Sequence, residues 1–313
     1  MAALIETIVA LRDACDQARA AGRTVGLVPT MGFLHEGHRS LMRCARAQTS
    51  FVVVTIFVNP LQFGPSEDLG RYPRDLAGDL ETCTAEGVDV VFAPSVAEMY
   101  PQRSATTVHV AGVTEGLCGE HRPGHFDGVT TVVTKLFAIA GPCHAYFGRK
   151  DAQQAAVVTR MAADLDLPVE VVACPLVREA DGLALSSRNA YLSPADRRVA
   201  PVLFRALAAA ADSVVAGERD PQRLRAAIRE TIATEPTIDL EYVEVRDAAS
   251  IAPIERVDGN VLVALAARLG GTRLIDNVGI SVAGTSVSVD LGAMSAMSEP
   301  SSSPPRSPSL ETS

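Results

Sequence analysis

The sequence lacks three features that each characterise a class of protein. It has no excess of positive charge, since 28 Lys and Arg face 37 Asp and Glu for a formal net charge of −9, whereas proteins that bind nucleic-acid backbones concentrate basic residues. It has no run of about 20 apolar residues, the length of a membrane span. It also has no basic segment followed by an apolar core at its start, as a secretory signal would need. These absences predict a soluble, cytoplasmic protein with no nucleic-acid or membrane partner, but they do not exclude a nucleotide substrate.

The sequence also lacks any pair of cysteines spaced as CxxC. Its six cysteines lie far apart, at positions 15, 44, 83, 118, 143 and 174, which favours buried thiols over a disulfide framework or a zinc site. What it does have is length and apolar content. A chain of 313 residues, 47% of them hydrophobic, can bury a substantial core and form about two domains.

Strand and helix patterns alternate through residues 1–176. Apolar runs predict strands at 25–29, 51–58, 88–93, 145–147 and 169–174, and helical spacing predicts helices at 5–21, 40–47, 75–86, 129–140 and 152–164. This alternation predicts an α/β domain with a mainly parallel sheet. Ligands of such sheets bind outside the C-terminal strand ends, where the loops at 29–38, 59–64 and 148–154 would converge.

From about residue 177 the pattern changes. Two alanine-rich helices at 194–216 and 221–234 precede strands at 241–245, 261–265 and 272–275, which predicts a smaller α+β domain over residues 177–285. Twelve of the last nineteen residues are Ser or Pro, and too few of the others are apolar to offset the entropy of ordering. We therefore expect a disordered tail over residues 286–313.

His35 and His38 lie between the strand at 25–29 and the helix that follows it. If that helix begins near Gly37, its unpaired N–H groups and the positive end of its dipole would meet both imidazoles at one point, which suits the phosphates of a nucleotide. Taken alone, the pair is better explained by one histidine that caps the helix and another that is exposed. A zinc site is less favoured, because helical metal ligands usually lie i, i+4 apart and no cysteine is near.

Two further loops carry polar groups suited to a nucleotide. In Gly148-Arg-Lys150-Asp151-Ala-Gln-Gln154 the lysine can pair with phosphate, the aspartate can help to hold Mg²⁺, and a glutamine can orient a polar substrate. In Leu185-Ser-Ser-Arg-Asn189 two hydroxyls and a guanidinium form a phosphate-binding set that could close over a nucleotide. In isolation, a solvated loop explains the first segment equally well, and a helix cap explains the second better.

Five segments in this order together resemble the pantoate–β-alanine ligase (pantothenate synthetase) family. They are Pro29-Thr-Met-Gly-Phe-Leu-His-Glu-Gly-His38, Phe57-Val-Asn-Pro-Leu-Gln-Phe63, Arg122-Pro-Gly-His-Phe126, Phe147-Gly-Arg-Lys-Asp-Ala-Gln-Gln154 and Arg178-Glu-Ala-Asp-Gly-Leu-Ala-Leu-Ser-Ser-Arg-Asn189. The resemblance covers about residues 5–285. It implies an enzyme that condenses (R)-pantoate with β-alanine through a pantoyl-adenylate, consuming ATP and releasing AMP and pyrophosphate. It also implies a Rossmann-like catalytic domain with an HxGH motif over residues 1–176, a C-terminal lid, Mg²⁺ and a homodimer.

The same resemblance implies roles for individual residues. The ATP site would comprise Pro29, Thr30, Met31, Gly32, Phe33, Leu34, His35, Glu36, Gly37, His38, Gly148, Arg149, Lys150, Asp151, Val177, Leu185, Ser186, Ser187 and Arg188. The catalytic groups among them would be His38, which is the family's proton donor, with His35, Lys150, Ser186, Ser187 and Arg188. Gln62 and Gln154 would hold pantoate, with Gln62 also near β-alanine. Asn59, His125, Arg122 and Tyr72 match substrate-binding positions with less definite roles, and Asp151 would contact Mg²⁺.

Three positions depart from the family's usual residues. Arg149 stands in place of Glu, Ala152 in place of an aromatic residue, and Leu185 in place of Met, which is a mild change of similar volume. Arg149 reverses a charge beside the phosphate loop, which leaves its effect on ATP or Mg²⁺ affinity open. Two alternative functions follow. A nucleotidyltransferase that adenylylates a phosphorylated metabolite is disfavoured by the neutral Gln62 and Gln154, and a nucleotide-binding module without catalysis is favoured by Arg149 alone.

Overall fold

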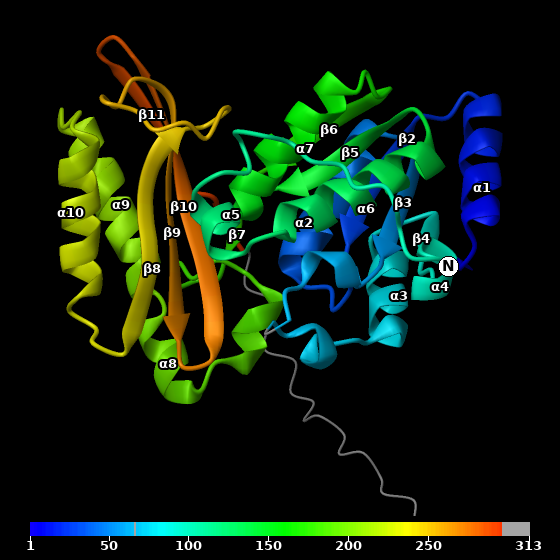
Figure 1. The fold of residues 1–313 in the computed structure, drawn as a ribbon, viewed down its shortest axis with the longest axis horizontal. Helices are drawn as coiled ribbons and strands as arrows, with labels where there is room; N and C mark the ends of the chain where they lie inside the picture. Colours follow the sequence, from blue (N-terminus) through cyan, green and yellow to red (C-terminus); the bar gives the residue numbers. More distant parts are fainter. Residues whose placement is uncertain (66, 296–313) are drawn as a thin grey trace, which may run out of the picture.

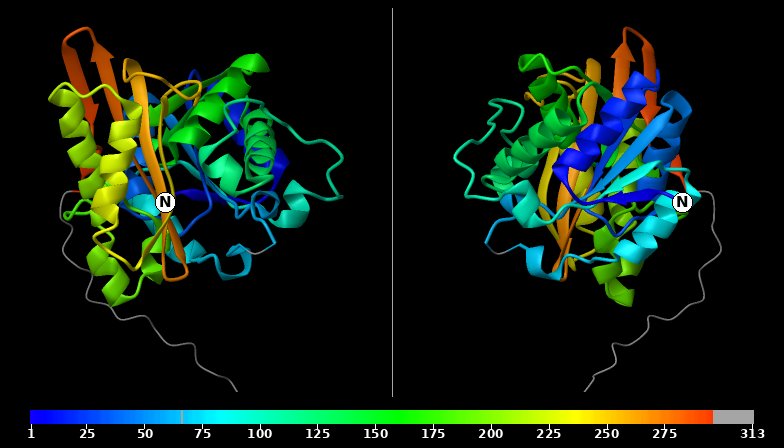
Figure 2. Two further views of the ribbon diagram at one scale, coloured as in Figure 1. Left: turned by 60° about the vertical axis from the view of Figure 1, so that its left-hand side comes forward. Right: turned by 90° about the vertical axis from the view of Figure 1, so that its right-hand side faces the viewer.

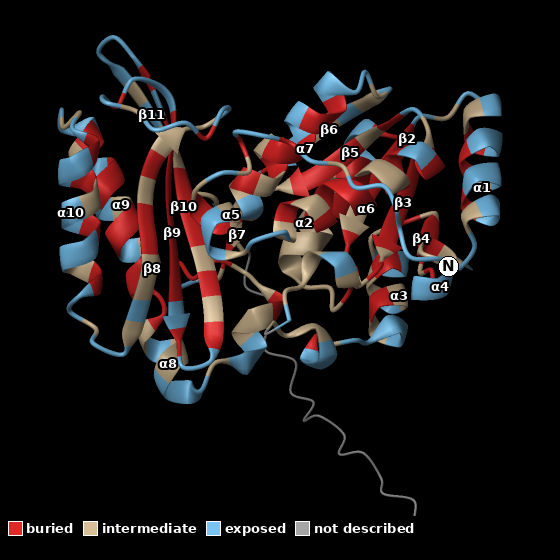
Figure 3. Ribbon diagram, viewed as in Figure 1, coloured by how far each residue is buried: buried red, intermediate tan, exposed pale blue. Residues whose placement is uncertain are grey.

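Two β-sheets lie side by side in this protein, and helices cover each of them (Figure 1). The structure is a computed structural model that describes residues 1–65 and 67–295. Buried residues concentrate in the two sheets, while the outer faces of the peripheral helices are exposed (Figure 3). No helix in the described part of the chain has the length and apolar character needed to cross a membrane.

The N-terminal sheet has six parallel strands in the order β1-β4-β3-β2-β5-β6. The strands are β1 (Ala3–Ile5), β2 (Val25–Thr30), β3 (Phe51–Ile56), β4 (Val90–Phe92), β5 (Cys143–Gly148) and β6 (Val169–Cys174). The chain winds outward from β2 to one side through β3 and later to the other side through β5. The neighbouring C-terminal ends of β2 and β5 therefore form the switch point at which ligands of such sheets bind.

Helices cover both faces of the parallel sheet, which explains why its central strands read as continuous apolar runs. They are α1 (Ile8–Ala20), α2 (Glu36–Gln48), α3 (Leu76–Ala85), α4 (Val96–Met99), α5 (Leu117–His121), α6 (His125–Ala140) and α7 (Ala152–Asp164). One face shares a core with α1, α6 and α7, and the other with α2 and α3. The predicted parallel α/β sheet is confirmed.

The second sheet is antiparallel, in the order β11-β10-β9-β8. Its strands are β8 (Ile238–Asp247), β9 (Gly259–Leu269), β10 (Thr272–Ala283) and β11 (Ser286–Asp290), and its helices are α8 (Pro194–Val199), α9 (Val202–Val215) and α10 (Pro221–Ile232). One face packs on α9 and α10. On the other face, Tyr242, Leu262, Ala264 and Ala266 join the core of the N-terminal part. The division near residue 176 stays a prediction, since a common core spans it.

The structure corrects two details of the C-terminal part. The helix expected over 194–216 is interrupted at Pro201, which separates α8 from α9, because proline has no N–H to continue a helix. The disorder expected from residue 286 is wrong for the first residues of that tail. There β11 pairs with β10 to form a projecting hairpin (Figure 2), and β12 (Ala293–Met294) pairs with β7 (Val177–Arg178).

The strand β11 forms because its sequence alternates serine with valine, and Val287 and Val289 pack on the core of the antiparallel sheet. Disorder was predicted for this segment because of the high serine and proline content of residues 295–313, which follow it. The rest of the predicted tail, residues 296–313, lies outside the described residues.

Candidate functional site

A cavity opens at the C-terminal ends of the parallel strands, between them and the segment that follows β7. Four 3₁₀ helices complete the surrounding loops: η1 (Pro60–Gln62), η2 (Leu69–Arg71), η3 (Arg149–Asp151) and η4 (Ser187–Tyr191). The cavity is lined by nineteen of the residues singled out in the sequence: Pro29, Thr30, Met31, His35, Gly37, His38, Gln62, Tyr72, Arg122, His125, Gly148, Lys150, Asp151, Gln154, Val177, Leu185, Ser186, Ser187 and Arg188. The structure therefore brings all five loops to one place.

The two histidines form the start of α2. His35 is its N-cap, and its Nδ1 accepts a hydrogen bond from the N–H of Gly37 at 3.1 Å. His38 reaches back one turn, so that its Nδ1 accepts from the N–H of His35 at 3.3 Å. A side chain at Gly37 would place its Cβ 2.9 Å from the His35 ring. The glycine between the histidines is therefore required by their close approach.

These bonds determine the protonation of both imidazoles. Because each Nδ1 accepts a hydrogen bond, each ring in its neutral form carries its proton on Nε2. Burial, followed by the charges of His38 and Lys150, lowers the pKa of His35 to about 2. Burial, followed by the charge of Lys150, lowers the pKa of His38 to about 4. The rings lie 4.1 Å apart. At neutral pH the pair thus presents two uncharged N–H donors beside a helix N-terminus.

Asp79 on α3 shapes the loop that precedes the histidines, and no local pattern in the sequence pointed to it. Its carboxylate accepts the N–H groups of Phe33 and Leu34 at 2.9 and 2.7 Å. Phe33 has a positive φ of 53°, and Gly32 before it one of 83°. Asp79 is buried, which raises the pKa of its carboxyl group. It offsets the strain of the loop by satisfying two otherwise unpaired donors.

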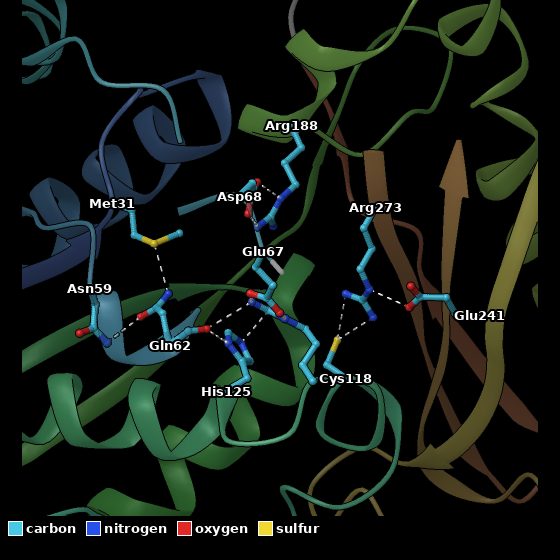
Figure 4. Close-up of polar contacts among 11 residues, drawn as sticks. Met31, Asn59, Gln62, Glu67, Asp68, Cys118, His125, Arg188, Glu241 and Arg273 are labelled. Carbon is cyan, nitrogen blue, oxygen red and sulfur yellow. Dashed lines mark hydrogen bonds and ion pairs between the residues drawn. The ribbon is translucent and has the colours of Figure 1, made fainter. Parts of the chain in front are cut away.

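Gln62 reaches the cavity from η1, which Asn59 caps (Figure 4). The Nε2 group of Gln62 lies 3.2 Å from Sδ of Met31, and its Oε1 accepts from Nδ2 of Asn59 at 3.1 Å. Asn59 itself is buried and accepts a bond from the hydroxyl of Tyr100 at 2.9 Å. The structure therefore places Asn59 behind the cavity wall, where it orients Gln62.

His125, labelled in Figure 4, extends this side of the cavity together with Arg122. Nε2 of His125 accepts from Arg122 at 2.9 Å, so its Nδ1 donates to the carbonyl of Gln62 at 2.8 Å. Burial and the charge of Arg122 lower the pKa of His125 to about 4. Arg122 forms a bidentate pair with Glu67 at 2.7 and 2.6 Å. Glu67 is a second residue that no motif in the sequence indicated.

The lysine loop follows β5. Lys150 lines the cavity, and its Nζ is 3.8 Å from the carboxylate of Asp151, whose side chain is half exposed. Arg149 does not line the cavity, because its side chain pairs with Asp290 of β11 at 2.6 Å. The carboxylate of Asp290, in the C-terminal segment, thus offsets the positive charge that Arg149 introduces.

The segment after β7 closes the cavity from the other side. Arg188 forms a bidentate pair with Asp68 at 3.1 and 3.0 Å. The hydroxyl of Ser186 caps η4 by accepting from the N–H of Arg188 at 3.2 Å. Ser187 is buried, and its hydroxyl is 3.4 Å from the carbonyl of Phe33. Ser187 and Arg188, which were predicted to bind phosphate, therefore connect the two parts of the molecule.

Six of the predicted site residues do not line the cavity: Gly32, Phe33, Leu34, Glu36, Asn59 and Arg149. The side chain of Glu36 pairs with Arg39 and Arg43 on the outer side of α2. Among the described residues, no group of three or more His, Cys, Asp or Glu could hold a metal ion. Apolar side chains for which the sequence predicted no role form one wall of the cavity: Phe57, Val129, Val132, Val133, Leu136 and Phe147.

Comparisons with known proteins agree with this geometry. The family model described as pantoate-beta-alanine ligase matches residues 3–279. The pantothenate synthetase of Moorella thermoacetica is 55% identical over 279 residues, which cover 89% of this chain and 99% of that protein. The crystal structure of pantothenate synthetase from Thermus thermophilus aligns with a TM-score of 0.84 at 46% identity, covering 88% of this chain and 98% of that one. A pantoate-beta-alanine ligase from Francisella tularensis, complexed with beta-gamma ATP and beta-alanine, aligns with a TM-score of 0.71 at 30% identity, covering 88% and 97%.

Proposed function

Because the chain belongs to the pantoate–β-alanine ligase family and is thus an enzyme that joins pantoate to β-alanine, we propose that it activates (R)-pantoate with ATP as a pantoyl-adenylate. AMP and pyrophosphate are then the other products. One observation carries the proposal: neutral imidazole donors and a lysine line the same cavity as an apolar wall flanked by glutamines.

The phosphates of ATP bind at the start of α2. The Nε2–H groups of His35 and His38 donate to them, the N-terminal end of the helix dipole adds partial positive charge, and Lys150 supplies a full charge. Ser186, Ser187 and Arg188 complete the contacts from the opposite side. To contact the phosphates, Arg188 must give up one or both of its hydrogen bonds to Asp68, because Asp68 accepts one from it at each carboxylate oxygen. The imidazoles, the helix N-terminus and Lys150 thus already surround the place where negative charge develops on pyrophosphate, and Arg188 joins them after it moves.

Pantoate binds between Gln62 and Gln154, and its methyl groups pack against the apolar wall formed by α6, Phe57 and Phe147. The neutral amides suit hydroxyl and carboxylate groups without adding a charge. β-Alanine binds near Gln62, where Arg122, His125 and Tyr72 also line the cavity. Asn59 acts from behind Gln62.

The reaction consists of two transfers. A pantoate carboxylate oxygen attacks the α-phosphorus of ATP, which forms the P–O bond of the adenylate and releases pyrophosphate. The amine of β-alanine then attacks the activated carbonyl carbon, loses a proton, and expels AMP as the amide bond forms. Activation is needed because the unmodified carboxylate would have to expel an oxide. Closure of the segment after β7 protects the water-sensitive adenylate.

The site can hold Mg²⁺ only together with bound ATP. Asp151 is a half-exposed carboxylate that lines the cavity beside Lys150, and Mg²⁺ is commonly held by one or two carboxylates together with substrate phosphates. Asp151 would therefore hold the ion only once ATP supplies the remaining oxygen ligands. When bound, the ion would neutralise phosphate charge.

We also propose a homodimer. Exposed apolar side chains from three neighbouring segments lie at the β1 edge of the parallel sheet: Leu4, Val9 and Val96. The segments are joined there by the bond between the N–H of Ile8 and Glu98 at 2.7 Å. Light scattering tests the dimer, which a solution mass equal to that of one chain would contradict.

Isotope exchange tests the adenylate. Labelled pyrophosphate should enter ATP only when pantoate and Mg²⁺ are present, and AMP should accumulate only after β-alanine is added. His38→Ala and His35→Ala should each remove most of this exchange while the far-ultraviolet circular dichroism is unchanged. Absence of exchange in the native protein with pantoate and Mg²⁺ would refute the adenylate, and exchange that needs a phosphate ester instead of pantoate would indicate the alternative nucleotidyltransferase.

A further inference from the structure

Asn277 lies on β10, in the antiparallel sheet, yet its side chain contacts the lysine loop of the other sheet. Its amide donates one hydrogen bond to the carbonyl of Arg149 and another to that of Lys150, both at 2.9 Å. Only 8% of Asn277 is exposed, so solvent is not at hand to replace these bonds. Two N–H groups of one amide thus fix two consecutive peptide carbonyls.

The backbone at Asn277 is itself firmly held. Asp276, the preceding residue, accepts from Arg178 at 2.7 and 2.9 Å and from the N–H of Asn277 at 2.7 Å. Arg178 also donates to the carbonyl of Asn277 at 3.0 Å. The side chains of Arg178 and Asp276 are 0% and 2% exposed. Asn277 therefore cannot follow movements of the lysine loop, and the loop must adopt the place that Asn277 sets.

The lysine loop, which leads from β5 into α7, lacks a side-chain cap at its start. The 3₁₀ helix η3 has only three residues, and its N-cap, Gly148, has no side chain with which to cap it. Lys150 and Asp151 both belong to η3, and both line the cavity. The direction of the peptide groups on either side of Lys150 decides where its amine lies. The antiparallel sheet supplies that direction through Asn277.

We propose that Asn277 is a positioning residue of the ligase reaction, which sets the place of Lys150 against the phosphates of ATP. The proposal rests on the function proposed above, because it takes Lys150 as a phosphate-binding group. Asn277 touches no substrate and acts through the backbone of η3. A misplacement of about 1 Å can cost on the order of 10²-fold in rate, so the loss of two hydrogen bonds at this loop should be visible in the kinetics.

The test compares Asn277→Ala and Asn277→Leu, the second of which keeps the volume of the side chain, by pantoate-dependent pyrophosphate exchange. Each should lower kcat/KM for ATP by at least about tenfold, with KM for pantoate unchanged, because the glutamines are not held by Asn277. In a Lys150→Ala background, Asn277→Ala should have little further effect, since the amine that it positions is gone. Asn260→Ala, an exposed asparagine on β9 of the same sheet, is the matched control and should behave as the native protein.

The outcomes separate the two proposals. No exchange in the native protein refutes the adenylate itself. If the native protein catalyses exchange and both Asn277→Ala and Asn277→Leu keep a near-native kcat/KM for ATP, the positioning role is refuted. It is also refuted if the fold-losses in kcat/KM caused by Asn277→Ala and Lys150→Ala multiply in the double variant. Failure of both variants to fold at 25 °C would also overturn it, because the amide would then support the fold rather than the loop.

Discussion

Replacing Arg178 with methionine removes the cation at the centre of the joint between the two sheets. All five N–H groups of Arg178 have acceptors: both carboxylate oxygens of Asp276, and the carbonyls of Gly182, Asn277 and Leu291. Its guanidinium also stacks on Phe204 at 4.2 Å. Methionine keeps the length and the apolar contact of the side chain. It leaves the buried Asp276 without a counter-ion, and it removes the Arg178 donor from three carbonyls.

The expected loss follows from that burial. Breaking a fully buried ion pair by removing one partner costs about 3–5 kcal/mol. With an unfolding entropy of about 2.1 cal/mol/K per residue, a loss of about 4 kcal/mol lowers Tm by about 7 °C if roughly 290 residues unfold together, but by about 17 °C if roughly 115 residues of the C-terminal part unfold alone. Because residues of the C-terminal part such as Tyr242 and Leu262 belong to the core of the N-terminal part, we expect the smaller shift in a single transition.

Scanning calorimetry and urea denaturation of Arg178→Met measure this loss. The double variant Arg178→Met/Asp276→Leu should recover part of it, because the uncompensated charge is removed as well. Arg160→Met is the control: it breaks an ion pair with Asp164 whose partners are 62% and 48% exposed, and should change stability by less than about 1 kcal/mol. A loss in Arg178→Met as small as that of the control would refute the reasoning.

Three further predictions concern the site and the chain end. Gly37→Ala should reduce pyrophosphate exchange severely, because the new Cβ would lie 2.9 Å from the His35 ring; native exchange by this variant would show that the capping geometry is unimportant. His35, His38 and His125 have pKa values lowered to about 2, 4 and 4 in the folded chain. The unfolded chain therefore binds more protons than the folded chain below pH about 6.5, and the free energy of unfolding should fall as the pH falls from about 6.5 to about 4. A urea midpoint that is constant over this pH range would contradict the lowered pKa values. A chain truncated after residue 285 should melt at a lower temperature than one truncated after residue 295, because it lacks β11 and the Leu291 acceptor; equal Tm values would show that the segment adds no stability.

Local patterns were sufficient to predict much of the parallel sheet and the histidine turn. The buried runs of β2 and β3 and the histidines on either side of Gly37 are signals confined to a few residues. The departures have a common physical origin in contacts between distant segments. Asp79 binds a loop about 45 residues earlier in the chain, Asp68 meets Arg188 across 120 positions, and Arg149 meets Asp290. No periodicity or motif records such partners.

The same reasoning explains what was misjudged at the chain end and in the site. The segment at 286–290 was expected to be disordered because its composition was averaged with the serine and proline that follow it. The family resemblance implied that Asn59 is a substrate contact, whereas its side chain is buried and bonded to Gln62 and to the carbonyl of Gly128. Sequence order therefore indicates which loops meet, but not which side chain of a loop reaches the cavity.

The arginines beside the cavity have a consequence for which anions the enzyme admits. Arg122 and Arg188 are each already held in two hydrogen bonds by a carboxylate, Glu67 and Asp68. An incoming anion must compete with that carboxylate, and a single small anion such as chloride or bicarbonate offers too little in return. A polyphosphate brings several charges at once, so we expect it to draw Arg188 from Asp68. We also expect the two pairs to disfavour the binding of single small anions at the cavity.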